Sequence, residues 1–575
     1  MNFKRPEKKE LITLMAAGCL IGILCFALVY GFDIVRFTYD DWLFFGDMDL
    51  KQHYNGFCHF RLSPWRFPVG LIDSLSVPYS MSVVYTDSIP LFAVIFKLFS
   101  GVLPVKFQYF GLFGLLCFAM MGMLSPVLIR RFTDSKIVCI AGSLLFILSY
   151  PVLHRMFYHT ALSAQWIIVL ALIVWFYTDI KDKNQTKKLC VYWALIGLLS
   201  VSIHSYFVFM TAIILMAQVV EGYVRAALDY KASAISEKED LGKKDGLIKL
   251  IISNIHIVFP LISLGLFAFI LLYILGGFYG SGSVSGDGFG SFNGNLSTYV
   301  NPMSFSTIFK GFELNGPFEF EGFAYVGIGV MALLCIMLLY YAFIKRDIIY
   351  RIKNLSLRKK VIFFTIIFVV LISCFPKYSF GGIKLISVPV PRIMQRLLGI
   401  CRTNARFVWV GMYLIITAAI YYVGKSFDKV WVKIIFALAI VLQIFELSGT
   451  VKAYQSKYSE HKEYVTLWEE LEDEHITDGK SQFVFMYDEN DIMMDTAYYA
   501  YLKGMSQNSF YYARTIYDEI DFTIEEWSDS FLNGDIDGSV IYIFRDGDYT
   551  DKYKEIVRST SAKEYSLKGH AIVVK

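Results

Sequence analysis

Charged residues and paired cysteines are both scarce in this sequence. Asp, Glu, Lys and Arg together make up 18% of the 575 residues, whereas a typical soluble domain has roughly a quarter. There are nine Cys, but no Cys-x-x-Cys spacing occurs and none follows Cys401. The sequence therefore gives no sign of a zinc knuckle or of a disulfide framework.

Signatures of nucleotide and nucleic-acid binding are missing as well. No Gly-x-x-x-x-Gly-Lys-Ser/Thr pattern is present that would form a phosphate-binding loop. The net charge is only +4, and Lys and Arg gather in particular loops. That distribution fits membrane orientation and gives no reason to expect nucleic acid as a partner. No internal repeat of about 20 to 50 residues is visible either.

Apolar residues, in contrast, are abundant and form long runs. They make up 56% of the chain, aromatic residues make up 17%, and the mean hydropathy is +0.50. Many runs reach the roughly 20 residues that a helix needs to cross about 30 Å of hydrocarbon. We therefore expect a polytopic α-helical membrane protein with about eleven transmembrane helices. The predicted spans are 11–30, 107–129, 137–153, 162–179, 189–206, 207–226, 254–275, 324–344, 361–375, 407–424 and 430–447.

The basic residues predict the orientation of these spans. Lys4, Arg5, Lys8 and Lys9 precede the first run and favour a cytoplasmic N-terminus. The first run has no Ala-x-Ala type cleavage site, so we interpret it as a retained helix. With eleven crossings, the later basic loops also lie inside and the C-terminal segment lies outside.

The odd number of crossings decides how two ambiguous segments are interpreted. The run 189–226 is predicted to break near His204-Ser205 into two spans, since one crossing would put the basic loop after Lys231 outside. The run Ile89–Leu103 is only about 15 residues long, which favours a re-entrant or interfacial helix. An ordinary short span is the alternative there.

The chain divides into two predicted domains. Residues 1–451 form the membrane domain, with a large outer first loop at 31–106, and residues 452–575 form a small extracytoplasmic α/β domain. In the second domain we expect an amphipathic helix at 461–474, strands at 482–488, 539–544 and 570–575, and helices near 495–502 and 552–559. The Gly- and Ser-rich start of the outer segment 276–323 indicates a flexible loop or lid, with a phosphate cradle as the alternative.

Acidic residues gather just beyond the first span, at Asp40, Asp41, Asp47 and Asp49. A carboxylate beside a low-dielectric boundary can act as a general base, because partial desolvation raises its proton affinity. Solvated loop acids without a catalytic role are the alternative. Further on, Thr86-Asp87-Ser88 before Pro90 reads as a helix start, in which Asp87 is either a cap or a ligand-binding residue.

Arginines and histidines mark the other outer boundaries. Arg392 and Arg396, and then Arg402 and Arg406, are spaced four apart beside an apolar span, with a helical turn expected from Pro391. Arginine suits bidentate phosphate binding, and lipid headgroups are the alternative partners. His154, Arg155, His159 and His204 have no zinc-motif spacing. They are either substrate hydrogen-bonding residues or structural residues at the interface.

Five stretches together resemble the GT-C superfamily of integral-membrane glycosyltransferases. They are GDMDLKQHYNGFCHFR, VVYTDSIPLFAVIFKLFSGVLPVKFQYFG, RMFYHTALSAQW, CRTNARFVW and GMSQNSFYYAR. More closely, they resemble a bacterial GT-C-like family known only as a domain of unknown function. The resemblance implies an inverting transferase of the bacterial plasma membrane. It would move a sugar from a polyprenyl-phosphate donor to an extracytoplasmic acceptor such as a cell-surface glycan.

The resemblance also implies roles for particular residues. The catalytic base would be Asp47, with Asp49 as runner-up. The four arginines would bind the donor phosphate. Some GT-C enzymes need a divalent metal such as Mg or Mn, and Asp47, Asp49 and Asp87 could hold one. The predicted substrate-binding residues are His53, Tyr54, Arg61, Arg66, Asp87, His154, His159 and His204.

Two other functions fit many of the same features. One is a transporter or flippase of lipid-linked glycans, and the other is a non-catalytic envelope assembly factor. A transporter is expected to show internal repeats and ionisable groups at mid-membrane depth. An assembly factor would not depend on the first-loop acids.

Overall fold

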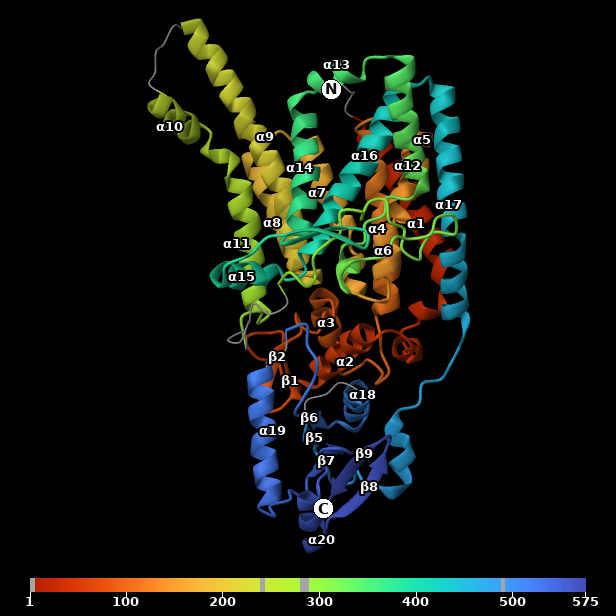
Figure 1. The fold of residues 1–575 in the computed structure, drawn as a ribbon, viewed down its shortest axis with the longest axis vertical. Coiled ribbons are helices and arrows are strands. Elements are labelled where there is room, and N and C mark those ends of the chain that lie inside the picture. The colour runs from red at the N-terminus through yellow and green to blue at the C-terminus, as the bar shows by residue number, and fades with distance from the viewer. Residues whose placement is uncertain (1–5, 238–242, 280–288, 488–491, 515) are drawn as a thin grey trace.

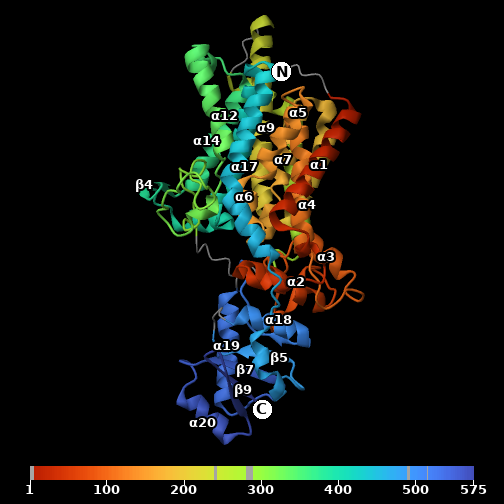
Figure 2. The ribbon, with the colours of Figure 1, turned by 90° about the vertical axis from the view of Figure 1, so that its right-hand side faces the viewer.

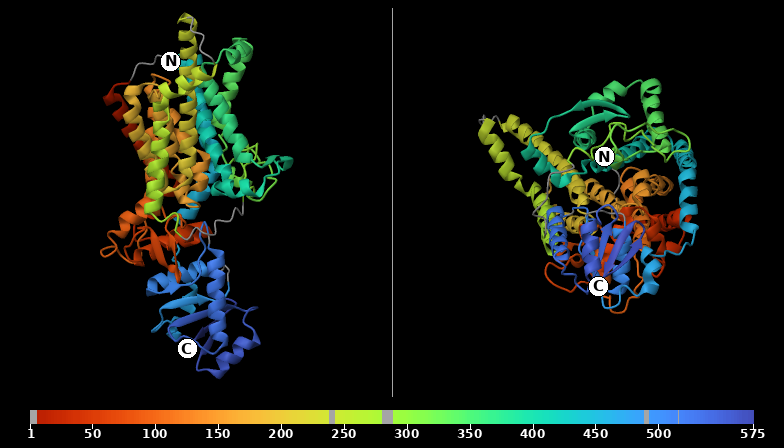
Figure 3. Two further views of the ribbon diagram at one scale, coloured as in Figure 1. Left: turned by 90° about the vertical axis from the view of Figure 1, so that its left-hand side faces the viewer. Right: turned by 60° about the horizontal axis from the view of Figure 1, so that its bottom comes forward.

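The computed structural model describes residues 6–237, 243–279, 289–487, 492–514 and 516–575. A bundle of helices forms the larger part, and a smaller domain with a β-sheet lies beyond one end of it (Figure 1). The N-terminal helix begins at the opposite end of the bundle from that domain (Figure 3). The two ends of the chain therefore lie at opposite ends of the molecule.

The structure is that of a multi-pass membrane protein. Within the described residues, eight helical segments are long and apolar enough to cross a membrane. They are Lys8–Tyr30, Phe110–Arg130, Thr160–Tyr177, Lys183–Ile203, Tyr206–Ala232, Ile255–Ile274, Asn404–Ser426 and Lys429–Ser459. The three other predicted spans coincide with α5 (Lys136–Ile147) followed by α6 (Tyr150–Arg155), with α12 (Ile328–Leu339), and with α14 (Leu357–Cys374).

The two segments whose interpretation depended on the number of crossings have the predicted structure. The long run is broken at His204, whose backbone is extended between α8 (Thr186–Ile203) and α9 (Tyr206–Glu237). The run Ile89–Leu103 contains only the eight-residue helix α3 (Pro90–Lys97), which is too short to cross a membrane. It lies beyond the end of the bundle, beside α2 (Met48–Leu62) (Figure 1).

Glycines bring α1 (Lys8–Tyr30) and α4 (Phe110–Arg130) into backbone contact. A Cβ atom added to Gly18 would lie 2.0 Å from the carbonyl oxygen of Gly122, and one added to Gly122 would lie 2.1 Å from that of Gly18. Small residues allow such close approach between membrane helices. Because α1 leads directly into the first outer loop, this contact fixes where that loop begins.

The first outer loop is folded. It contains a 3₁₀ helix (Asp41–Phe45), α2, the hairpin of β1 (Leu71–Ser76) and β2 (Tyr79–Ser82), and then α3. Ten of the fifteen residues of α2 are buried, from Leu50 to Phe60 with one exception. Neither α2 nor the hairpin was predicted, because α2 has no clean polar face and is covered on several sides.

The C-terminal domain has one mixed five-stranded sheet in the order β6-β5-β7-β9-β8. Its strands are β5 (Gln482–Phe485), β6 (Ser506–Gln507), β7 (Val540–Arg545), β8 (Lys563–Leu567) and β9 (His570–Val574). Its helices are α18 (Met493–Lys503), α19 (Tyr517–Leu532) and α20 (Asp551–Ser559). The three predicted strands and two of the helices are confirmed, although Asp488 lies outside the described residues.

Other elements of this domain differ from the predictions. The helix expected at 461–474 is only a 3₁₀ segment, Leu467–Glu474. Strands β6 and β8 and helix α19 were not predicted. Helix α19 does have an apolar stripe at helical spacing, which its many acidic residues obscured, formed by Ile520, Ile524, Trp527 and Phe531. Strand β8 lies at the sheet edge with only Leu567 buried, so it lacks the apolar pattern of a buried strand.

The C-terminal domain packs tightly on the first outer loop. The buried carboxylate of Asp40 accepts hydrogen bonds from the hydroxyls of Tyr54 (2.8 Å) and Tyr498 (2.7 Å). The ring of Phe44 stacks on that of Tyr464 with centroids 4.1 Å apart. One continuous hydrophobic core includes buried side chains from both domains.

The segment 376–406, between the predicted spans 361–375 and 407–424, also contains structure that was not predicted. Strands β3 (Lys377–Phe380) and β4 (Ile383–Ser387) form a hairpin that projects sideways from the bundle (Figure 2). It is followed by α15 (Arg392–Leu398), which begins after Pro391 as expected. The Gly-rich lid predicted within 276–323 has its central part, residues 280–288, outside the described residues.

Candidate functional site

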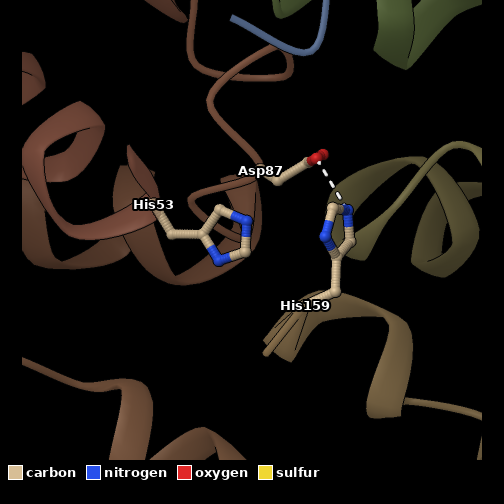
Figure 4. Close-up of side chains that lie close together, drawn as sticks. All are labelled: His53, Asp87 and His159. Atoms are coloured by element: carbon tan, nitrogen blue, oxygen red, sulfur yellow. Dashed lines mark ion pairs between the residues drawn. The ribbon is translucent and has the colours of Figure 1, made fainter. Parts of the chain in front are cut away.

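Three buried side chains from separate segments meet where the bundle joins the first outer loop. Each of His53, Asp87 and His159 offers a nitrogen or oxygen atom, and these atoms all lie within 4.8 Å of one another (Figure 4). The three residues are far apart in sequence and come from α2, from the loop before α3, and from the turn before α7 (Trp166–Tyr177). We call His53, Asp87 and His159, together with Asp49 and His204, the acid–histidine cluster.

The local backbone explains how Asp87 reaches the cluster. Its φ angle is +50°, and that of Ile89 is +54°, a left-handed region that non-glycine residues rarely adopt. The predicted capping role is wrong, since α3 has Ile89 at its N-cap and no side-chain cap hydrogen bond. Pro90 does occupy the first turn, as expected. The strained turn directs the Asp87 carboxylate toward the histidines.

His159 connects the two carboxylates of the cluster. Its Nδ1 lies 3.0 Å from the Oδ2 of Asp49, and its Nε2 lies 3.3 Å from the Oδ2 of Asp87. His204 approaches the other oxygen of Asp87, with its Nε2 at 3.4 Å. Burial alone would lower the pKa of His159, but the hydrogen bonds to the two carboxylates raise it to about 9.

The pKa values of the two carboxylates shift in the opposite direction. Burial would raise the pKa of Asp87, but the neighbouring His204 and His159 hold it well below its usual range. Burial opposes ionisation of Asp49 too, and the hydrogen bond with His159 outweighs it and lowers the pKa. Both acids are therefore ionised at neutral pH.

His53 is the most unusual member. Its side chain is fully buried, and neither ring nitrogen has a hydrogen-bond partner among the described residues. Burial lowers the pKa of His53 to about 4, so the ring is neutral at pH 7 and carries a free lone pair. A buried polar group without a partner is rare and calls for an explanation, such as an ion.

A second charged group lies next to the cluster. Glu321 pairs with Arg155 (2.8 Å) and with Arg406 (2.9 Å), and all three side chains are buried. The guanidinium of Arg406 lies 4.9 Å from the ring centroid of Tyr206, two residues after His204. Two cations against one anion leave this group positive beside the negative carboxylates.

An apolar groove of about 670 Å³ runs along the bundle toward these charges. It lies between one face of α9, from Phe209 to Val220, and α14. That face extends for about 16 Å, at 1.5 Å per residue. The groove ends beside Asn404 and Phe407, which flank Arg406. The lining residues are Phe209, Ala212, Ile213, Met216, Ala217, Val220, Phe289, Val361, Phe364, Thr365, Phe368, Ile372, Phe375, Leu398, Ile400, Cys401, Asn404 and Phe407.

Comparison with protein families places the sequence in one of them. The family model described as "Domain of unknown function (DUF6311)" matches residues 19–448. A companion model, "DUF6311 C-terminal domain", matches residues 468–565. The chain belongs to the DUF6311 family. The expected membership of a family of unknown function is thereby confirmed, and no match was found among the curated proteins.

Among solved structures, this DUF6311 chain is similar to oligosaccharyltransferases of Archaeoglobus fulgidus. One, tethered to an acceptor peptide containing the NVT sequon, gives a TM-score of 0.45 at 12% identity over 96% of this chain and 71% of that chain. Another, AglB in complex with an inhibitory peptide and a dolichol-phosphate, gives 0.42 at 12% identity over 98% and 74%. The acceptor peptide, the inhibitory peptide and the dolichol-phosphate are ligands of those archaeal proteins.

The structure gathers five of the predicted site residues of the DUF6311 chain, namely Asp49, His53, Asp87, His159 and His204. Asp47, the first choice for the base, lies two residues from Asp49 but is exposed and caps α2 by accepting a hydrogen bond from Met48 N at 2.7 Å. It is not part of the cluster. The expected metal site formed by Asp47, Asp49 and Asp87 is therefore not assembled in the structure.

Four predicted substrate-binding residues have other surroundings. Tyr54 donates to Asp40, and Arg61 donates to Tyr501 and to backbone carbonyls of the first loop. Arg66 forms a partly exposed ion pair with Asp73. His154 is partly buried and packs against phenylalanine rings. Their polarity suggested ligand binding, but the contacts named here occupy most of their polar groups, and only that of Arg61 with Tyr501 joins the two domains.

The four arginines divide into two kinds. Arg392 and Arg396 are exposed on α15. Arg402 donates to the carbonyl of Ala513 in the C-terminal domain, and Arg406 is paired with Glu321. Glu321 was not predicted, although an acid directly before the apolar span 324–344 was a usable signal.

Proposed function

We propose that this DUF6311 protein is a GT-C-type membrane glycosyltransferase. In this proposal it moves a sugar from a polyprenyl-phosphate lipid to an acceptor, such as a cell-surface glycan, on the outer face of a bacterial plasma membrane. The observation that carries the proposal is the apolar groove that ends beside Arg406, whose charged group lies next to the acid–histidine cluster. A substrate with a long apolar tail and a polar head fits that combination.

The groove would bind the lipid tail of the donor, and the arginines would bind its phosphate. The tail would lie between α9 and α14, where the lining is almost entirely apolar. The phosphate would lie at the outer end of the groove, near Arg402 and Arg406 and within reach of α15 with Arg392 and Arg396. Arginine can bind phosphate with two parallel hydrogen bonds and keeps its charge when buried.

In the reaction, an acceptor hydroxyl would attack the anomeric carbon while the bond from that carbon to the phosphate oxygen breaks. The lipid phosphate leaves with the bonding electrons, and the carboxylate of Asp49 takes the hydroxyl proton. A single displacement of this kind inverts the anomeric centre. We favour Asp49 over Asp47 as the base because His159 holds its carboxylate at the cluster, and a positioned base contributes about 10²- to 10⁴-fold to the rate.

The cluster also fits a divalent cation. His53, Asp87 and His159 would hold it, with His159 releasing the Nε2 proton that faces Asp87 when the cation binds. The unpartnered ring nitrogens of His53 are the feature in favour. Two imidazoles with one carboxylate suit Mn²⁺ or Zn²⁺ better than Mg²⁺, which prefers oxygen ligands. A bound cation would supply positive charge that polarises a substrate oxygen.

The decisive test compares strains that make equal amounts of the intact chain, of Asp49→Asn and of Asp47→Asn, together with a deletion strain. Mass spectrometry of cell-surface glycans and of lipid-linked sugars is the measurement. We expect the deletion and Asp49→Asn to lose the same sugar from the glycan and to accumulate its lipid-linked donor. Asp47→Asn should resemble the intact chain, because Asn caps a helix as well as Asp does.

Two results would count against the proposal. If Asp49→Asn keeps the sugar that the deletion loses, Asp49 is not the base, and a transporter or assembly factor explains the deletion better. If Asp47→Asn loses it instead, the helix-capping residue has the role that we assign to Asp49.

A further inference from the structure

One segment of the C-terminal domain reaches back to the membrane domain. From Gln507, the last residue of β6, to Arg514 the chain leaves the sheet and passes the β1–β2 hairpin before α19 begins (Figure 1). We call residues 507–514 the strap. Most of its side chains are buried, including Asn508, Phe510 and Tyr512.

Backbone atoms fasten the strap to the membrane domain. Its first carbonyl, that of Gln507, accepts a hydrogen bond from Val77 N at 3.0 Å. The carbonyl of Tyr511 accepts one from Gln52 Nε2 at 2.9 Å. These contacts do not depend on the Tyr511 side chain.

The next residues of the strap are fastened in the same way. The amide of Ala513 donates to the carbonyl of Tyr85 at 2.9 Å, and its carbonyl accepts from Arg402 at 3.0 Å. Arg514 donates to the carbonyl of Ile400 at 2.7 Å. The strap thus lies between the first outer loop and the segment that carries the basic residues.

The fastening points are close in sequence to the two carboxylates of the cluster. Gln52 is one helical turn beyond Asp49 on α2, and residues three apart share a helix face. Tyr85 is two residues before Asp87. Tyr511 is therefore held between the segments that supply both acids.

The side chain of Tyr511 is the part of the strap that nothing else uses. It is only partly buried, and its hydroxyl makes no hydrogen bond with the described residues. Burial raises the pKa of Tyr511, and the charges of Asp49, Arg402 and Asp87 act on it as well. The phenol is therefore in electrostatic reach of both carboxylates and of an arginine.

We infer that the C-terminal domain completes the catalytic pocket, with Tyr511 as the residue that contacts and orients the sugar. This inference rests on the proposed function. A tyrosine ring offers an apolar face to the C–H face of a pyranose and a hydroxyl to its polar edge. The domain is then part of the active site, and its position decides which sugar or acceptor is accepted.

The test uses the full chain in cells, with Tyr511→Ala, Tyr511→Phe and Asp49→Asn beside the intact protein. Phe522→Ala is the matched control, because Phe522 is an exposed aromatic residue on α19 of the same domain. The readouts are the cell-surface glycan, by mass spectrometry, and the melting temperature of each purified protein. We expect Tyr511→Ala to lower sugar incorporation at least tenfold with an unchanged melting temperature, because the backbone holds the strap. Tyr511→Phe, which keeps the ring, should retain more.

The outcomes separate this inference from the proposed function. If Asp49→Asn incorporates sugar normally, the proposed function fails and the inference with it. If Asp49→Asn is inactive while Tyr511→Ala matches Phe522→Ala, only the inference is overturned. It is also overturned if Tyr511→Ala loses incorporation together with thermal stability, because the residue is then structural.

Discussion

At the scale of single residues, two neighbouring aspartates have different surroundings. Asp47 is the N-cap of α2 and Asp49 lies in its first turn, so one caps the helix at the surface and the other bonds His159. Helix geometry explains this, because positions two apart point to different sides. Composition alone could not distinguish them, since both are acids beside the same span.

The unpartnered ring of His53 leads to a prediction about metal. The purified intact protein should hold close to one equivalent of Mn²⁺ or Zn²⁺, measured by elemental mass spectrometry, and His53→Phe should lose most of it. His154→Phe is the control, since His154 is a partly buried histidine that packs on Phe305 and Phe323, away from the cluster. Equal metal content in the two variants, or none in the intact protein, would contradict the metal site.

A second residue-scale prediction concerns pH. Burial raises the pKa of Asp495 to about 6, despite a hydrogen bond from Leu467 N. Below about pH 4 the group is protonated in both folded and unfolded chains. Between about pH 4 and 6 the folded chain keeps a proton that the unfolded chain releases, so the free energy of unfolding falls as pH rises.

Asp495→Asn should remove this dependence. Above about pH 6 we expect the variant to be more stable than the intact protein by roughly 2 to 3 kcal/mol, and near pH 4 the two should be equal. Denaturant unfolding of the full chain at both pH values measures this. Glu525→Gln, at an exposed position of α19, should change neither value, and an unchanged Asp495→Asn would show that the buried acid carries no penalty.

At the scale of elements, the contact between α1 and α4 depends on two glycines, Gly18 and Gly122, which have no Cβ atom. Gly122→Val would place methyl groups where the Gly18 backbone now lies. Overpacking of this kind costs about 1 to 3 kcal/mol or more. We expect a lower melting temperature in detergent and less folded protein in the membrane.

Gly265 on α11 (Phe259–Ile274) provides a matched control, because a Cβ atom added there meets nothing within 4 Å. Gly265→Val should therefore melt close to the intact protein. Similar losses in both variants would show that valine disturbs any of these membrane helices, and that the glycine contact has no special role.

At the scale of the whole molecule, different features lie at the two ends of the bundle. The acid–histidine cluster, the first outer loop and the C-terminal domain are all at one end, while α13 (Ile348–Lys353) and the N-terminus are at the other (Figure 1). From the positive-inside rule we predict that the basic loops lie in the cytoplasm and that the cluster therefore lies outside.

Cysteine labelling tests this orientation. Glu525→Cys, on α19, should react with a membrane-impermeant maleimide in intact cells, and Lys353→Cys, on α13, only after permeabilisation. Both positions are exposed, and the unsubstituted chain gives the background from native cysteines. The reverse pattern would place the cluster in the cytoplasm and exclude an acceptor on the outer face.

The membrane architecture was largely readable from the sequence. Span positions, the break at His204, the short helix α3 and the change of composition after the last span all depend on features within about 20 residues, namely the length of apolar runs and the charges that flank them. A membrane imposes one thickness on every segment, so local sequence is enough to predict the crossings.

Within the site, the sequence identified the chemical types but not the partners. His53, Asp87 and His159 come from three segments separated by up to about a hundred residues, and only packing brings them together. The pairing of Glu321 with two arginines and the return of the strap to the first outer loop also depend on contacts between distant parts of the chain. Such contacts are determined by the packing of the whole fold, which no local pattern of residues records.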